Sequence, residues 1–267
     1  MNEAHPFFAA IHLSAGYGRQ PVLRDISFTL EQGCLAGVLG ANGCGKTTLL
    51  KAICGILPHA GRCTLQETCL EQLTPRQLAR RCGYIPQRSG ISIDLSVLEV
   101  VLMGFNPQLG LLEHPTPAMR EKARRALALT GLAHREKDNY LQLSEGQKQL
   151  CILARTLAAD SQLLLLDEPE SALDFRHRYR ILDLLRTWAG KGNGSALVAL
   201  HDPLLALNCC DQLLVLSDGR VQACLTPGKD ALPRIERELA AIYGPVSLQY
   251  CTGRNGQRQI VLLKEPD

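Results

Sequence analysis

The strongest constraint on the fold is the segment GANGCGKT at residues 40–47, which fits the spacing G-x-x-x-x-G-K-[ST] of a phosphate-binding loop. A continuous apolar run at 34–39 precedes it, and such a run is typical of a strand buried in a parallel sheet. Residues 46–55 follow it and predict a helix. This order of strand, glycine-rich loop and helix indicates an α/β protein that binds the phosphates of a nucleotide.

The residue types in this loop suit phosphate chemistry. Glycines let successive backbone N–H groups curve around phosphate oxygens, and the helix N-terminus adds a positive partial charge. We expect the Lys46 ammonium to reach the β- and γ-phosphates of ATP, and the Thr47 hydroxyl to ligate Mg²⁺. The ATP-binding residues predicted here are Gly40, Asn42, Gly43, Cys44, Gly45, Lys46, Thr47 and Thr48.

A second motif, LLLLDE at 163–168, ends an apolar strand with two acids. Because the carboxyl ends of parallel strands meet at one edge of a sheet, we expect Asp167 and Glu168 to lie beside the phosphate loop. Asp167 would hold Mg²⁺ through water, and Glu168 would polarise an attacking water. The two motifs together predict a nucleoside triphosphatase.

Composition excludes several other classes. A net charge of +3 and 4% aromatic residues argue against a nucleic-acid-binding protein, which usually shows a basic stripe or aromatic stacking platforms. The 11 cysteines form no C-x-x-C pair, so we expect them reduced, in a cytosolic protein without a zinc ribbon. No apolar run approaches the ~20 residues of a membrane span. Any membrane-spanning part must then come from another chain.

We predict one domain over 1–267 with two recognisable parts inside it. A helical subdomain is expected at 88–160, and a C-terminal extension of a helix and a β-hairpin at 227–267. Strands are expected at 9–13, 26–30, 60–73 (with a hairpin), 163–166, 196–200 and 212–216, and helices at 95–105, 115–134, 175–190 and 235–243. The hairpin is interpreted as two strands within 247–263, around the turn Gly253-Arg254-Asn255-Gly256.

The segment LSEGQ at 143–147 resembles the LSGGQ signature of ABC ATPases, and the other landmarks of that family follow in order. Tyr17 matches the aromatic that stacks on adenine, Gln87 the Q-loop, and His201 the switch histidine. The segment Ser171-Ala172-Leu173-Asp174 matches the D-loop. The resemblance covers roughly residues 8 to 225. It implies a P-loop ATPase core with an N-terminal antiparallel β subdomain and a helical subdomain.

The resemblance also implies a mechanism. Two such chains would pack head to tail and hold two ATP molecules between the phosphate loop of one and the signature of the other. Tyr17 and the phosphate loop would bind ATP from one chain, with Glu168, His201 and Gln87 catalytic and Thr47, Gln87 and Asp167 at Mg²⁺. Ser144, Gly146 and Gln147 would act on the partner's ATP. Ser144 with Gln147 also fits a helix capping box, and both interpretations hold together.

Two residues depart from the family pattern. Glu145 stands where glycine is usual, and its carboxylate would weaken the positive field at the helix N-terminus. We expect it to turn away from the site. Glu170 stands where threonine is frequent, and the sequence gives it no role. Cys44, inside the loop, would block ATP binding when alkylated, with Mg-ATP protecting it; it is otherwise a small buried apolar residue.

Residues 97–110 resemble the subdomain of ATPases that serve importers of iron-siderophore, haem and cobalamin type, although Phe105-Asn106 replaces their Arg-rich step. The implied partners are a second copy of the chain, integral membrane permease subunits docked around 87–110, and indirectly a substrate-binding protein, with no nucleic acid. The implied location is the cytoplasmic face of the cell membrane. The alternatives are an exporter ATPase, a soluble ABC ATPase without a transport role, and a nucleotide-binding regulator with little turnover. The cargo stays open.

Overall fold

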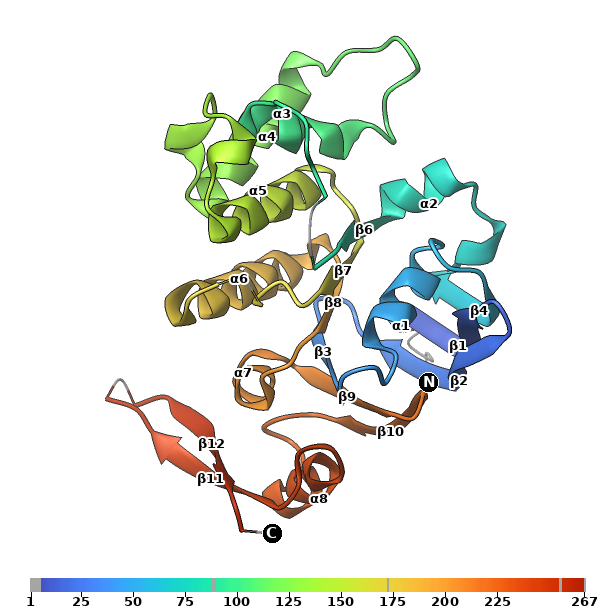
Figure 1. Cartoon of the computed structure of the whole chain (residues 1–267), viewed down its shortest axis with the longest axis vertical. Helices are drawn as coiled ribbons and strands as arrows, with labels where there is room; N and C mark the ends of the chain where they lie inside the picture. The colour runs from blue at the N-terminus through green and yellow to red at the C-terminus, as the bar shows by residue number, and fades with distance from the viewer. Residues whose placement is uncertain (1–5, 88–89, 172, 255, 267) are drawn as a thin grey trace.

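A six-stranded sheet with the order β10-β9-β3-β8-β7-β6 organises the computed structural model, which describes residues 6–87, 90–171, 173–254 and 256–266 (Figure 1). Five adjacent strands, β6, β7, β8, β3 and β9, run parallel to one another, and β10 lies at one edge of the sheet, antiparallel to β9. The strands are β3 (Leu35–Leu39), β6 (Cys82–Ile85), β7 (Leu163–Asp167), β8 (Ser195–Ala199), β9 (Gln212–Ser217) and β10 (Arg220–Leu225).

Alternating side chains on the central strands build two separate apolar cores, one on each face of the sheet. In β3, Leu35 and Leu39 face one core while Ala36 and Val38 face the other. The strand is buried on both faces, which is why it reads as an unbroken apolar run rather than an alternating one. The phosphate loop therefore emerges from the middle of the sheet, on a strand held from both sides.

The first core is covered by helices. Figure 1 shows α3, α4 and α5 gathered at one end of the molecule, with α6 next to α5 on the same side. The helices on this side are α3 (Val97–Leu102) continued by a 3₁₀ turn η2 (Met103–Phe105), α4 (Pro117–Thr130), α5 (Glu145–Ala158), α6 (Phe175–Trp188) and α7 (Pro203–Cys209). Two short turns, η3 (Ala133–Arg135) and η4 (Tyr140–Gln142), lie between α4 and α5, and a π-helical turn η5 (Ala189–Asn193) leads from α6 to β8.

The second core lies under a smaller antiparallel sheet with the order β2-β1-β4-β5. Its strands are β1 (Phe8–Tyr17), β2 (Gln20–Leu30), β4 (His59–Leu65) and β5 (Thr68–Cys69), followed by the 3₁₀ turn η1 (Leu70–Gln72) and α2 (Pro75–Arg81). Helix α1 (Lys46–Ile53) packs between the two sheets. The expected fold class, a P-loop core with an N-terminal antiparallel β part and a helical part, is confirmed.

The C-terminal segment adds α8 (Leu232–Tyr243) and a hairpin of β11 (Val246–Thr252) and β12 (Arg258–Lys264). Asn208 of α7 fastens the hairpin, because its amide donates to the Ile260 carbonyl and accepts from the Ile260 N–H, both at 2.9 Å. The expected hairpin is thus confirmed; Asn255 of its expected turn lies outside the described residues.

Several element ends differ from the sequence expectation. The helix expected at 115–134 begins at Pro117, where Thr116 caps it, and ends at Thr130 because Gly131 adopts a positive φ of 80°. The helix expected at 46–55 ends at Ile53, ahead of Gly55 at φ 72°. α2, β6, α7 and β10 were not expected. Within the described part of the chain, no helix has both the length and the apolar character to cross a membrane.

Candidate functional site

The phosphate loop joins the end of β3 to the start of α1. Gly43 and Gly45 adopt φ values of 79° and 113°, which side-chain-bearing residues rarely adopt, and a Cβ on Gly45 would lie 2.7 Å from Leu23 Cδ2. Gly45 is also the N-cap of α1, and within the described residues no side chain caps it. The first N–H groups of α1 therefore stay available to an anion.

Lys46 lies at the mouth of a cavity of about 370 Å³. Its side chain is buried, and its Nζ donates to the carbonyls of Gly40 at 2.9 Å and Ala41 at 3.3 Å. In the ranges that the structure describes, no carboxylate lies within ion-pair distance of this ammonium. A buried cation satisfied only by carbonyls is suited to a phosphate. The cavity is lined by Asn42, Gly43, Gly45, Lys46, Thr47, Thr48, Gln87, Glu168 and His201.

A pair of hard oxygen donors lies beside the loop. Thr47 Oγ1 donates to Asp167 Oδ1 at 3.0 Å, and the Tyr84 hydroxyl reaches Asp167 Oδ2 at 3.4 Å. Burial raises the pKa of the Asp167 carboxyl, and the hydrogen bond from Thr47 opposes that shift. A buried carboxylate with a neighbouring hydroxyl and no ion-pair partner among the described residues fits Mg²⁺, which prefers oxygen ligands.

The Glu168 carboxylate is fixed from both sides. His201 Nε2 lies 2.5 Å from Oε1, and Gln87 Nε2 donates to Oε2 at 2.7 Å. The three residues come from the ends of β7, β8 and β6, which are neighbours in the sheet. Glu168 also has a positive φ of 51°, a conformation that costs a residue with a side chain about 1 kcal/mol or more. The convergence of strand ends thus explains why residues over 80 positions apart share one site.

Glu170, which had no predicted role, lies buried next to His201. It is buried, and its Oε1 accepts from the His201 backbone N–H at 3.2 Å. Its other oxygen has no partner among the described residues. Burial raises the pKa of this carboxyl. Glu170 therefore holds the backbone of the residue that contacts Glu168.

Tyr17 lies apart from the phosphate cavity. It is 51% exposed and lines a separate hollow of about 700 Å³ formed by the β1–β2 turn and by residues 57–60. An exposed aromatic ring beside an open hollow is free to stack on a planar group. The stacking of Tyr17 on the adenine ring of ATP therefore stays a prediction.

The LSEGQ segment is not brought to the phosphate loop of its own chain. Ser144 is the N-cap of α5, with a complete capping box to Gln147: the Gln147 N–H donates to Ser144 Oγ at 3.3 Å, and the Ser144 N–H to Gln147 Oε1 at 3.1 Å. Ser144 is exposed and Gly146 half-buried. The Glu145 carboxylate is exposed and pairs with Lys148 Nζ at 2.7 Å. This helix N-terminus therefore faces outward.

The D-loop segment leads into α6. Asp174 caps that helix by accepting from the His177 N–H at 2.9 Å, and Leu173 is buried. Ala172 of the segment lies outside the described residues.

The structure thus gathers the loop residues, Thr47, Gln87, Asp167, Glu168 and His201, and leaves Tyr17 and the LSEGQ residues elsewhere. Tyr84 was missed. The pairing of β6 with β7 explains its position: Tyr84 pairs with Leu165, and Leu165 and Asp167, two residues apart, lie on the same face of the sheet.

Comparison with known proteins agrees with this geometry. The family described as ABC transporter matches residues 23–171. The hemin import ATP-binding protein HmuV of Bordetella pertussis is 41% identical over 232 residues, covering 84% of this chain and 87% of that protein. The cobalamin import ATP-binding protein BtuD of Halobacterium salinarum is 36% identical, covering 77% of this chain and 52% of that protein. A metal-chelate type ABC transporter solved in an inward-facing conformation has a chain with a TM-score of 0.82 and 26% identity, covering 98% of this chain and 99% of that one.

Proposed function

Because the chain belongs to the ABC transporter family, as an ATP-binding and ATP-hydrolysing subunit, we propose that it powers the import of a metal chelate of the haem or cobalamin class. Two relatives bear the names of hemin and cobalamin importers, and the structural neighbour described above belongs to a metal-chelate type transporter. The resemblance of residues 97–110 to that group points the same way.

The observation that carries the ATPase chemistry is the Glu168 carboxylate held between His201 and Gln87 at the mouth of the phosphate cavity. In this arrangement Glu168 orients and polarises the attacking water, and His201 fixes the carboxylate that accepts its proton. Gln87 reaches from the β6 end and senses whether the cavity is filled. Mg²⁺, when bound by Thr47 and Asp167, supplies charge neutralisation for the phosphates.

The loop residues bind and position the triphosphate. The uncapped N-terminus of α1 and the glycine conformations aim backbone N–H groups into the cavity. Lys46 exchanges its two carbonyl partners for phosphate oxygens, which costs no desolvation because the ammonium is already buried. A single chain therefore supplies Glu168 as the base, Lys46 as the cation, and Thr47 with Asp167 as the Mg²⁺ ligands, all on one side of the phosphates.

The opposite side of the phosphates is open, and we propose that the LSEGQ segment of a second copy covers it. Ser144, Gly146 and Gln147 lie at an outward-facing helix N-terminus that finds no ligand in its own chain. The pairing makes the active unit a head-to-tail dimer.

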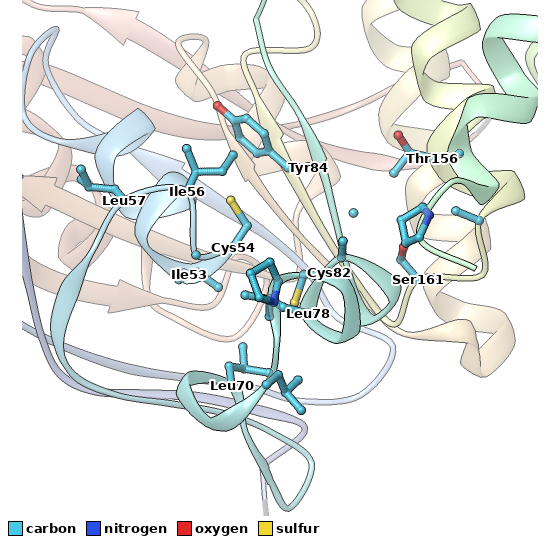
Figure 2. A pocket seen from close by; sticks show the side chains of 18 of the residues that line it. Ile53, Cys54, Ile56, Leu57, Leu70, Leu78, Cys82, Tyr84, Thr156 and Ser161 are labelled. Carbon is cyan, nitrogen blue, oxygen red and sulfur yellow. The ribbon is translucent and has the colours of Figure 1, made fainter. Parts of the chain in front are cut away.

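We propose that the membrane permease docks in the groove that Figure 2 shows. This groove has a volume of about 650 Å³ and lies between the end of α1, η1, α2 and the α5 side of the molecule. Ile53, Ile56, Leu57, Leu70 and Leu78 line one part, and Thr156 and Ser161 lie across from them (Figure 2). An apolar groove of this kind takes one face of an amphipathic helix. Tyr84 lines the groove and also bonds Asp167, so the two sites share a residue.

An ATPase assay tests the chemistry. Glu168→Gln keeps the shape of the side chain and both of its neighbours but removes the base, and we expect Mg-dependent turnover to fall by roughly 10²–10⁴. ATP binding should persist, because the loop is untouched. Glu265→Gln, an exposed acid on the C-terminal side, serves as the matched control. Turnover in Glu168→Gln equal to wild type would remove Glu168 from the mechanism.

A second experiment tests transport separately. The tagged chain, extracted from its native membranes in mild detergent, should carry a many-helix permease in stoichiometric amount. Reconstituted with that permease, it should drive ATP-dependent uptake of haem or a corrinoid. Uptake of neither, or efflux in its place, would overturn the importer assignment while leaving the ATPase chemistry standing.

A further inference from the structure

A cluster of nitrogen, sulfur and oxygen donors lies at the β4–β5 hairpin, outside the ATP cavity. His59 of β4, Cys63 of β4 and Glu71 of η1 each place one ligand atom within 4.8 Å of the other two. Glu71 is the common neighbour: its Oε1 lies 2.9 Å from His59 Nε2, and its Oε2 lies 3.0 Å from Cys69 Sγ. Three side chains with metal-binding chemistry, those of His59, Cys63 and Cys69, therefore meet around the Glu71 carboxylate.

The backbone is irregular between His59 and Cys63, where β4 pairs with a bulge in β1. Residues four apart in a regular strand stand about 13 Å apart, too far for His59 and Cys63 to share a ligand. The pairing of β1 with β4 shifts register between Ile11 and Ser14, opposite Gly61, which has a φ of 92°. A Cβ at Gly61 would lie 2.4 Å from the His12 carbonyl oxygen, so only glycine fits. His59 and Cys63 lie on either side of this irregularity, and their ligand atoms both lie within 4.8 Å of the one from Glu71.

The cluster is also sheltered. Cys63 is fully buried in the core between the two sheets, and the side chain of His59 is only 9% exposed. Glu71 closes the outer side, with its side chain 29% exposed and its Oε1 also accepting from the Cys63 N–H at 2.6 Å. The fold thus places the Glu71 carboxylate next to the buried Cys63 thiol and the His59 imidazole.

We propose that His59, Cys63 and Glu71 bind a divalent transition metal ion of the zinc class, with Cys69 as the nearest candidate for a fourth ligand. Mixed nitrogen, sulfur and oxygen donors in a small site suit Zn²⁺, which takes four ligands at about 2.0–2.3 Å in a tetrahedron. A neutral imidazole, a thiolate and a carboxylate carry two negative charges together. These three ligands balance a dication, and Cys69, which is half-buried, would add one further negative charge if it bound as a thiolate.

Without a metal, burial raises the pKa of the Cys63 thiol, and the nearby Glu71 carboxylate raises it further. The thiol therefore keeps its proton in the metal-free chain. A dication that takes the sulfur as a ligand displaces this proton to the solvent, as metal binding to cysteine requires. Side-chain movements of about 1 Å bring the three donor atoms to the distances that zinc ligation needs.

The position of the cluster gives the metal a structural role. His59 and Glu71 line the same groove as Leu57 and Leu70, which Figure 2 labels, and neither belongs to the lining of the phosphate cavity. A bound ion would tie β4 to η1 and so fix one wall of the groove. This inference does not depend on the transported cargo.

Titration with Co²⁺ tests the proposal, because a thiolate bound to Co²⁺ gives a near-ultraviolet charge-transfer band and tetrahedral Co²⁺ gives visible bands. The full chain, stripped with a chelator and kept in excess Mg²⁺ to fill the Asp167 site, should bind one equivalent with both features. Zn²⁺ should then displace the Co²⁺ and bleach the spectrum. Zn²⁺ should also raise Tm by on the order of 5 °C when it is at about 100 times its Kd.

Variants assign the ligands. Cys63→Ala, which keeps an apolar side chain in the core, and His59→Gln should each lose the charge-transfer band or the tetrahedral bands and the Zn²⁺-dependent rise in Tm. Cys251→Ser, at an exposed cysteine of the C-terminal hairpin, should keep both. A folded wild type without a thiolate–Co²⁺ band would overturn the proposal and leave a hydrogen-bonded cluster. A band that survives in Cys63→Ala and His59→Gln would overturn it equally, because the metal would then sit elsewhere.

Discussion

Two helix N-termini in this chain are prepared for the same kind of ligand in opposite ways. At α1 the N-cap is Gly45 in a left-handed conformation, no side-chain cap is made among the described residues, and a cavity stands in front. At α5 the N-cap is Ser144, its capping box with Gln147 satisfies the N–H groups of these two residues, and Glu145 adds a negative charge in the first turn.

The difference shows which end binds by itself. Free N–H groups, a buried ammonium and a glycine loop make α1 a complete anion seat. At the α5 end the capping box already uses the N–H groups of Ser144 and Gln147, and Glu145 puts a carboxylate in the first turn, so this end attracts an anion less strongly than α1 does. A site that needs both ends therefore exists only in a dimer.

The largest effect should come from two variants, each of which disables one of the two helix N-termini. Lys46→Ala disables the α1 end, and Gly146→Asp adds a carboxylate to the first turn of α5, where an acid does not disturb the helix. Each variant alone should lose turnover by roughly 100-fold or more. Mixed together, they should regain part of it, because one site of the mixed dimer combines two unaltered ends. No recovery in the mixture, measured as ATPase activity against each variant alone, would mean that the two ends do not share a site.

A second effect should appear at the thiol of Cys44, inside the α1 loop. Burial raises the pKa of this thiol, so alkylation should be slow near neutral pH and faster by about tenfold per pH unit toward the pKa. Once alkylated, the loop should no longer bind ATP, and Mg-ATP should protect it. Nucleotide binding after mass-verified modification is the measurement, and Cys44→Ala is the control, since its nucleotide binding should survive alkylation of the exposed Cys224 and Cys251. Full binding by the alkylated wild type would contradict the expectation.

A smaller effect separates the two unusual acids, since Glu170 is buried and Glu145 is exposed. Burial raises the pKa of Glu170, so the folded chain holds its proton more tightly than the unfolded chain. Stability from this proton is complete below the ordinary glutamate pKa and is lost as the pH rises toward the folded value. Glu170→Gln removes the titration, so its free energy of unfolding relative to wild type should increase with pH over that window. Denaturant unfolding at a series of pH values measures it, and parallel curves for the two proteins would argue that Glu170 does not titrate there.

The smallest effect belongs to Glu145. Its carboxylate is exposed and engaged by Lys148, so Glu145→Gln should change ATP affinity and dimer turnover by about twofold or less, the scale of one exposed ion pair. A gain of tenfold or more in turnover would show that the Glu145 carboxylate repels the phosphates of ATP and weakens their binding at the α5 N-terminus.

Much of the core could be predicted because its signals are local. The apolar run before the loop, the glycines and the strand ending in Asp167 and Glu168 predict that the two acids lie beside the loop, and in the structure Thr47 bonds Asp167 and Glu168 lines the loop cavity. The family landmarks supplied Gln87 and His201, and in the structure both side chains contact Glu168; their roles in the reaction stay predictions.

The rest depends on relations between distant segments. Tyr84 reaches Asp167 only because β6 pairs with β7, and Glu170 meets the His201 backbone only because β8 follows β7 in the sheet. The short helix α2 was missed because seven residues with two arginines at the end give too little apolar periodicity. The donor cluster at Glu71 lies beside a bulge that no periodic pattern announces.

The left-handed backbone at Glu168 has a further consequence for how this chain can change over time. Glycine would adopt that conformation with less strain, so a replacement there would favour the folded state while removing the base that the reaction needs. At this one position, selection for robustness and selection for activity point to different amino acids. A screen that rewards thermal stability alone would be expected to find inactive proteins there first.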